Sequence, residues 1–258
     1  MSKIISIHSF RGGTGKSNLT ANIATNVAMT GKRVAIVDTD IQSPGIHTLF
    51  GFDESKIDKA LNDYLWGKAK IEECAYAIHE TAAKEPGREY LAGHKIWLIP
   101  SSIRTSEIAR VVREGYDVGL LNEGFHSVID ELNLDYLFID THPGINEETL
   151  LSIAISSALV IILRPDQQDF QGTAVTVDVA QRLEVPKLRL VVNMALPYRD
   201  FKQMKEVISQ TYNVPVAGVL PLSDDVVANA SSQIFSVLYP DHQWSQTIRE
   251  ITEEIIQD

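Results

Sequence analysis

Cysteine is almost missing from this sequence: Cys74 is the only one among 258 residues. A single thiol cannot close a disulfide within the chain. It also cannot supply the several thiolates that a structural zinc site or an iron–sulfur cluster needs. For one copy of the chain, a disulfide-stapled secreted fold and a cysteine-ligated metal domain are therefore both excluded.

Long apolar runs are also lacking, and so is an excess of positive charge. No stretch approaches the ~20 apolar residues that span a bilayer, and the first apolar stretch leads into a glycine-rich loop instead of a signal-peptide cleavage site. The formal net charge is −11, which opposes non-specific binding to nucleic acid or an anionic membrane unless a local basic patch overrides it. We expect a cytoplasmic protein.

The remaining composition is ordinary for a soluble globular protein, with 44% hydrophobic and 22% charged residues. Strand-like apolar runs alternate with helical patterns, without internal repeats or a linker rich in Pro, Gly or Ser. This alternation predicts one α/β domain over residues 1–258, a doubly wound and mainly parallel sheet flanked by helices. A nucleotide would then bind at the carboxyl ends of the strands.

The strongest motif is the glycine-rich stretch Ser9–Ser17, with the sequence SFRGGTGKS. It follows the apolar run Ile4–Ile7 and opens a helical pattern in which Leu19, Ile23 and Val27 recur every four residues. A strand, a glycine-rich loop and a helix in this order form a P-loop, whose glycines let backbone N–H groups close around phosphate oxygens.

The residue types of this loop fit a nucleoside triphosphate, ATP in our interpretation, bound with Mg²⁺. Lys16 is placed to reach the β- and γ-phosphates, and the Ser17 hydroxyl is placed to ligate Mg²⁺. The usual pattern has a glycine where Phe10 stands, so a glycine-rich turn that binds nothing is the alternative. The other residues predicted to bind the nucleotide here are Gly12, Gly13, Thr14, Gly15 and Asn18.

Carboxylates follow two further strand patterns. The buried run 33–37 leads into Asp38 and Asp40. Acids at the carboxyl end of a strand lie where α/β sheets bind ligands, although these two could instead cap the next helix. The run 134–139 ends in Asp140, and an apolar strand ending in aspartate downstream of a P-loop is typical of the Walker B acid that holds the Mg²⁺ shell. His142 is interpreted as a loop histidine without chemistry.

The other patterns give the approximate positions of further elements. Helices are expected over 57–66, 105–114 and 118–132, and strands over 95–100, 158–163, 188–192 and 215–221. The polar segment 81–93 is expected to be an exposed loop. The last helix has an apolar seam and an acidic outer face, so we expect it to pack on the core and not to anchor a membrane.

The loop resembles the deviant P-loop x-K-G-G-x-x-K-[ST] of the ParA/MinD ATPase family, which accepts any residue at the position of Phe10. The D-x-D after the second strand and the D-T-x-P-G run from Asp140 to Gly144 are similar to the switch I and switch II segments of that family. The resemblance to this family covers nearly the whole chain. One position departs: the signature lysine, which crosses to the partner's phosphates in a face-to-face dimer, is Arg11 here.

The resemblance implies roles for several residues. Asp40 would help to position the attacking water, and Asp38 would support the Mg²⁺ site. Asn193, at the end of the strand 188–192, would read adenine, with Pro221 beside the base. Arg11 keeps the charge of the signature lysine but is longer and planar, so it could act as an arginine finger in trans unless another basic residue has replaced it.

The resemblance further implies a slow, Mg²⁺-dependent ATPase that forms a homodimer with ATP and is stimulated by an unidentified partner protein. Its output would be the positioning or partition of a plasmid, a chromosome or a protein organelle. The missing lysine points toward the carboxysome-positioning branch. Nucleoid association through non-specific DNA binding stays open, although the arginines at 104, 110 and 113 read better as a solvated helix face.

Two alternatives from other classes remain. One is a metabolic P-loop enzyme of the same superfamily, ligase-like or kinase-like, and the other is a nucleotide-binding interaction protein that has lost hydrolysis. The single cysteine weighs against the nitrogenase iron-protein branch and the cluster-carrier branch of that superfamily, both of which use paired cysteines.

Overall fold

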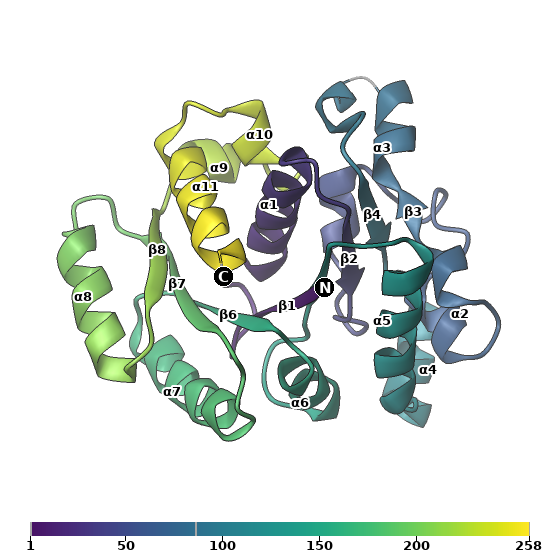
Figure 1. Ribbon diagram of the computed structural model, residues 1–258, viewed down its shortest axis with the longest axis horizontal. Helices are drawn as coiled ribbons and strands as arrows, with labels where there is room; N and C mark the ends of the chain where they lie inside the picture. Colours follow the sequence, from purple (N-terminus) through teal and green to yellow (C-terminus); the bar gives the residue numbers. More distant parts are fainter. Residues whose placement is uncertain (1, 86, 258) are drawn as a thin grey trace.

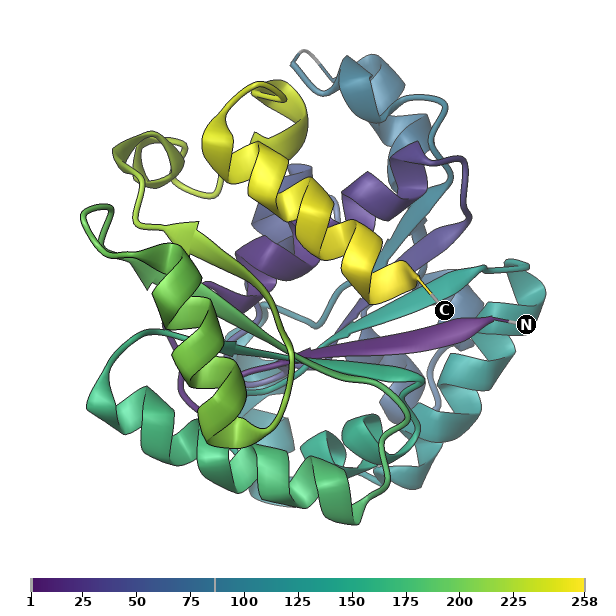
Figure 2. The same ribbon diagram turned by 60° about the vertical axis from the view of Figure 1, so that its left-hand side comes forward.

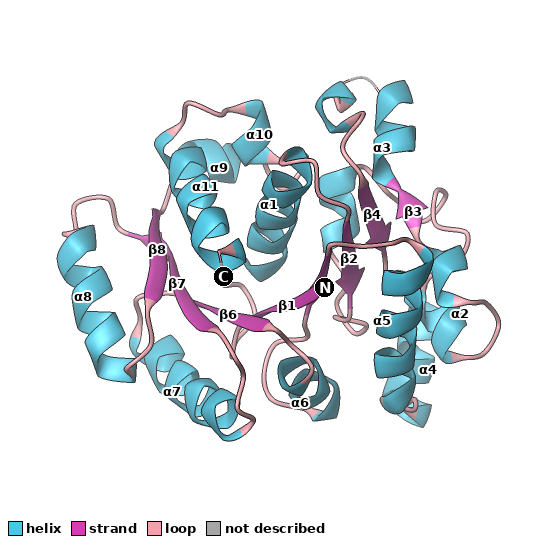
Figure 3. Cartoon of the chain, in the orientation of Figure 1, coloured by secondary structure: helices cyan, strands magenta, loops and turns pink. Residues whose placement is uncertain are grey.

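Eight strands form one sheet in the computed structural model, which describes residues 2–85 and 87–257 (Figure 3). The strand order is β3-β4-β2-β5-β1-β6-β7-β8, and every neighbouring pair is parallel except β3 with β4. This order confirms the predicted doubly wound, mainly parallel α/β sheet. The strands are β1 Lys3–His8, β2 Val34–Asp38, β3 Tyr76–Ala77, β4 Ile96–Ile99, β5 Tyr136–Asp140, β6 Ala158–Leu163, β7 Leu188–Ala195 and β8 Val216–Pro221.

Helices and short helical turns connect these strands. The α-helices are α1 Lys16–Met29, α2 Leu61–Leu65, α3 Ile78–Thr81, α4 Thr105–Glu114, α5 Gly119–Glu131, α6 Glu147–Ala154, α7 Gln167–Arg182, α8 Phe201–Tyr212, α9 Asp224–Ala228, α10 Phe235–Leu238 and α11 Gln243–Ile256. Short 3₁₀ turns lie at Ile46–Phe50, Ile71–Cys74, Ala82–Lys84 and Glu89–Leu91. In the described ranges no helix combines the length and the apolar character needed to cross a bilayer.

Both faces of the sheet are covered, because successive strand residues point to opposite sides. Ile36 and Phe138 pack in the layer that contains α1 and α11, whereas their neighbours Val37 and Ile139 pack in the layer that contains α5. On the other half of the sheet, α7 and α8 cover the second face. Figures 1 and 2 show α1 and α11 side by side on one face and α7 on the other.

The register of the central strands decides where the functional side chains meet. Strand β5 lies between β1 and β2, so Asp140 is in register with Ile7 on one side and with Asp38 on the other. The carboxyl ends of all three strands therefore share one edge of the sheet. The glycine-rich loop leaves β1 at this same edge.

Several predicted elements differ from the structure. The helix predicted over 57–66 spans only α2, because the Asp63 carboxylate accepts a hydrogen bond from the backbone N–H of Ala60 and caps the helix there. The expectation of an exposed loop over 81–93 is wrong in its described part, which forms helical turns and buries Ala82 and Leu91 in the core. The sequence reading did not predict β3, α6 or α8.

The last helix confirms its prediction. Trp244, Ile248, Ile251 and Ile255 are all buried along one seam of α11, which packs against α1 and β8. Gly218 of β8 makes this close contact feasible, since a Cβ there would lie 2.5 Å from a side-chain carbon of Ile251. The apolar seam is therefore part of the core, as predicted.

Candidate functional site

The glycine-rich loop joins β1 to α1 as predicted, and two of its glycines are required by their geometry. Gly13 and Gly15 have φ angles of 77° and 84°, the left-handed region that side chains disfavour. A Cβ on Gly15 would also lie 2.5 Å from Nδ2 of Asn193. The loop ends on the N-terminus of α1, where unpaired N–H groups and the helix dipole favour an anion.

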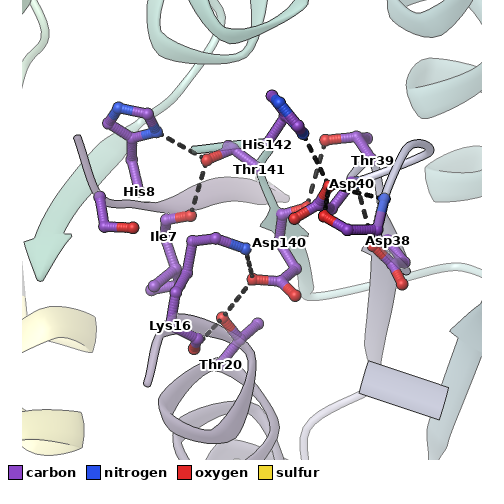
Figure 4. A network of polar contacts seen from close by, with 12 residues as sticks. Ile7, His8, Lys16, Thr20, Asp38, Thr39, Asp40, Asp140, Thr141 and His142 are labelled. Atoms are coloured by element: carbon purple, nitrogen blue, oxygen red, sulfur yellow. Dashed lines mark hydrogen bonds and ion pairs between the residues drawn. The ribbon is translucent and has the colours of Figure 1, made fainter. Parts of the chain in front are cut away.

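Lys16, the first residue of α1, forms a buried ion pair with Asp140, the last residue of β5. The lysine Nζ lies 2.7 Å from Oδ1 of Asp140, and the two side chains are 7% and 1% exposed (Figure 4). The hydroxyl of Thr20 also donates to the same oxygen over 3.1 Å. Sequence reasoning missed Thr20, although its spacing of four from Lys16 places both on one face of α1.

Asp38 is fully buried beside Asp140. One of its oxygens accepts the backbone N–H of Asp40 over 3.0 Å, and the other has no hydrogen-bond partner. Burial raises the pKa of Asp38 well above its usual value, and the negative charge of Asp140 raises it further. A cation at this point would favour the ionised form of both carboxylates.

The donor set fits Mg²⁺ on this evidence. The Oδ2 atoms of Asp38 and Asp140 are both buried without a partner, and buried carboxylate oxygens rarely stay unpaired unless a ligand serves them. Ser17 lines a cavity that borders the glycine-rich loop at the same edge. Mg²⁺ usually takes only one or two carboxylates from a protein and completes its shell with waters and phosphate oxygens.

Asp40 and His142 contact each other across the turns that follow β2 and β5. Nδ1 of His142 donates to Oδ1 of Asp40 over 2.7 Å (Figure 4). Burial favours the neutral form of Asp40, but the hydrogen bond from His142 and the charge of Lys16 outweigh it and lower the pKa of Asp40. The hydrogen bond to Asp40 raises the pKa of His142. His142, interpreted from the sequence as a loop histidine without chemistry, therefore has a carboxylate as its hydrogen-bond partner.

A second histidine, His8, lies fully buried at the end of β1. Its Nδ1 contacts the Thr141 hydroxyl over 2.8 Å, and that hydroxyl donates to the carbonyl of Ile7 over 3.1 Å. Nε2 of His8 is buried and has no hydrogen-bond partner among the described residues. Burial lowers the pKa of His8 to about 3, and the charge of Lys16 contributes to this shift.

Two cavities run along the loop and share residues. The first, of about 380 Å³, is bounded by the loop from Gly12 to Asn18 and by Asp40. The second, of about 200 Å³, is bounded by Asn193, Pro221 and Trp244. Gly15, Asn18 and Ser231 border both, so the two cavities adjoin along the loop.

The second cavity is mainly apolar, as ligand pockets that hold an aromatic ring usually are. Asn193 holds the loop by donating from Nδ2 to the carbonyl of Thr14 over 2.8 Å, which leaves its Oδ1 as an acceptor. Met194, Ala230 and Ser231 border this cavity with φ angles of 58°, 48° and 55°, an unusual concentration of left-handed residues that are not glycine. No local sequence pattern pointed to these three.

Arg11 points toward the N-terminus of α7 in the same chain. Its Nη1 lies 3.6 Å from Oδ1 of Asp169 and 3.9 Å from Oδ1 of Asp166, and its side chain is 38% exposed. Arg164 pairs with the same two acids through their other oxygens. The predicted trans contact would therefore have to replace an intramolecular one.

Phe10, the departure from the usual P-loop pattern, packs against α7. Gly172 lies in the middle of that helix, and a Cβ there would fall 2.1 Å from Cδ1 of Phe10. The aromatic ring thus occupies the space that a side chain at 172 would fill. The sequence alone does not indicate that these two residues are in contact, since 162 positions separate them.

Comparison with known proteins gives a consistent result over the full length. Residues 1–256 match the ParA family model, described as NUBPL iron-transfer P-loop NTPase. An uncharacterized ATP-binding protein of Methanocaldococcus jannaschii is 28% identical over 99% of this chain and 88% of its own. The septum site-determining protein MinD of Bacillus subtilis is 24% identical over 99% and 90%.

A similar solved structure supports the fold. The septum site-determining protein MinD of Pyrococcus horikoshii, complexed with Mg-ADP, has a TM-score of 0.80 and 21% identity. The match covers 100% of this chain and 97% of that protein. The sheet and its flanking helices therefore follow a known architecture from end to end.

Proposed function

Because the chain belongs to the ParA family of P-loop NTPases, we propose that it is a slow, Mg²⁺-dependent ATPase that dimerises with ATP. Its proposed output is the positioning or partition of a cargo, in line with the site-determining proteins among its relatives. We propose that residues 1–258 act as one domain and that an additional protein stimulates hydrolysis. Arg11 in place of the family's signature lysine favours a protein organelle as the cargo.

The observation that carries this proposal is the pair of adjoining cavities along the loop. One is bordered by Lys16 and the N-terminus of α1, and the other is apolar with an amide acceptor on Asn193. An amide oxygen suits the exocyclic amino group of adenine. A nucleoside triphosphate spans such a space with its charge at one end and its base at the other.

The proposed roles follow from the contacts. A triphosphate in the loop offers Lys16 a second anion, which would weaken its pair with Asp140 and free that carboxylate for the cation shell. When bound, Mg²⁺ neutralises charge on the phosphates. Asp40 is held ionised, so it can accept a hydrogen bond from a water aimed at the γ-phosphate.

Iron transfer, the activity in the description of the family model, is a poor fit to this chain. Cys74 is buried, and burial raises the pKa of its thiol to about 12, so it is not a thiolate at neutral pH. A cluster carried between two copies would need thiolates that both copies expose. We therefore do not extend this activity to the chain.

Phosphate release in Mg-ATP alone tests the proposal. We expect slow release by the wild type, and we expect Asp40→Ala to stop release while it still binds ATP and accumulates as a dimer. Asp58→Ala, which changes an exposed acid in the same region, is the matched control and should behave as the wild type. Release that requires an added small molecule would favour a metabolic enzyme, and dimerisation without any turnover would favour a protein that has lost hydrolysis.

A further inference from the structure

We propose that His142 positions Asp40 for hydrolysis, by holding the carboxylate from the turn that follows β5. This inference rests on the proposed ATPase function and adds a residue to it. Its basis is the 2.7 Å hydrogen bond between Nδ1 of His142 and Oδ1 of Asp40, two residues 102 positions apart in sequence (Figure 4).

The backbone that presents His142 is fixed on three sides. The Thr141 hydroxyl donates to the carbonyl of Ile7, and the Gly144 N–H donates to the carbonyl of Ser9 over 3.2 Å. On the helix side, the Thr149 hydroxyl donates to the carbonyl of His142 over 3.4 Å. The imidazole therefore projects from a turn that is tied to β1, to the glycine-rich loop and to α6.

The carboxylate of Asp40 is held in one orientation. Its Oδ1 accepts from His142 and also from the hydroxyl and the N–H of Ser43, over 2.8 Å and 3.2 Å. In the part of the chain that the structure describes, no hydrogen bond uses Oδ2. One oxygen is thus anchored and the other is left for a water in the phosphate cavity that Asp40 borders.

His142 is the anchor that comes from outside the turn of Asp40. Ser43 is only three residues away and moves with the same turn, so it cannot fix the carboxylate relative to the loop. Thr39 also joins the two turns, but it does so through the carbonyl of Asp140 and leaves the Asp40 side chain free to rotate. Loss of the imidazole should misplace the carboxylate without emptying the nucleotide site.

Steady-state kinetics of His142 variants test this role. We expect His142→Ala to lower kcat by about tenfold to a hundredfold, the range for one hydrogen bond to a charged group, with the KM for ATP within about threefold of wild type. His142→Asn should recover most of kcat, because its amide N–H₂ can replace Nδ1–H. His126→Ala, an exposed histidine of α5, is the control.

Two results would overturn the role: an unchanged kcat in His142→Ala, or equal losses in His142→Ala and His142→Asn. A double-mutant cycle on Tm, measured by thermal unfolding without nucleotide, separates this inference from the proposed function. The Tm changes of His142→Ala and Asp40→Ala should not add in the double variant, since both remove one contact. If the wild type hydrolyses no ATP, the proposed function fails. The inference about His142 fails separately if the two Tm changes add, because additive changes would refute the contact with Asp40.

Discussion

The packing of Phe10 on Gly172 gives a prediction whose sign can be reversed by a second substitution. In Gly172→Ala the new Cβ would lie 2.1 Å, 2.3 Å and 2.7 Å from Cδ1, Cγ and Cβ of Phe10. A change of rotamer cannot relieve the contact with the Cβ of Phe10, because that atom is fixed by the backbone. The loop or α7 must therefore move.

The magnitude follows from two opposed terms. An alanine in a helix interior is favoured over glycine by about 1 kcal/mol. Overpacking of a well-filled site costs about 1–3 kcal/mol, and the three short contacts place this site at the upper end. We expect a net loss of about 2 kcal/mol, which lowers Tm by about 4–8 °C in a chain of this size.

Differential scanning calorimetry of four proteins measures the effect. Gly172→Ala should lower Tm in the wild-type background. In the Phe10→Gly background, which removes the Cβ at position 10 together with the ring, it should leave Tm unchanged or raise it, because only the helix propensity remains. An equal fall of Tm in both backgrounds would refute the packing argument. The aromatic residue in place of the usual glycine would then need another explanation.

The remaining predictions concern the buried charges. Lys16→Ala should abolish nucleotide binding, and an unchanged ATP affinity by titration calorimetry would remove the phosphate-loop assignment. His8 binds a proton near pH 6.5 when unfolded but only near pH 3 when folded, so its contribution to stability is complete above pH 6.5 and is lost as pH falls toward 3. Its share of that loss is about 1.4 kcal/mol per pH unit. His8→Gln should therefore show a shallower fall of Tm between pH 7 and pH 5, and parallel curves for the two proteins would contradict this.

Local sequence patterns predicted the parts of the site that are close in the chain. The run from β1 through the glycine-rich loop to α1 could be read directly, because strand, glycines and helix period are all local signals. The acids at the ends of β2 and β5 could be read for the same reason. These patterns do not show that the acids meet, since that depends on β5 lying between β1 and β2, and periodicity does not encode strand order. The family resemblance, and not a local pattern, placed Asp38 at the Mg²⁺ site of Asp140.

Contacts between distant segments account for most of what was missed. The contact of His142 with Asp40 was not predicted, because a loop histidine shows no partner until the turn of Asp40 is placed beside it. From the sequence, Phe10 is only a departure from the usual P-loop pattern, because Gly172, against which it packs, is distant in sequence. The helical turns of 81–93 read as a polar loop, since the apolar residues that they bury are too few to show a period.

The measurement that tests the account most directly is the mass in solution of the wild type and of Arg11→Ala, each with and without Mg-ATP. We predict that Mg-ATP doubles the mass of the wild type and leaves Arg11→Ala a monomer, because Arg11 would exchange Asp166 and Asp169 for the phosphates of a second copy. A wild type that keeps the monomer mass in saturating Mg-ATP would contradict the ATP-driven dimer.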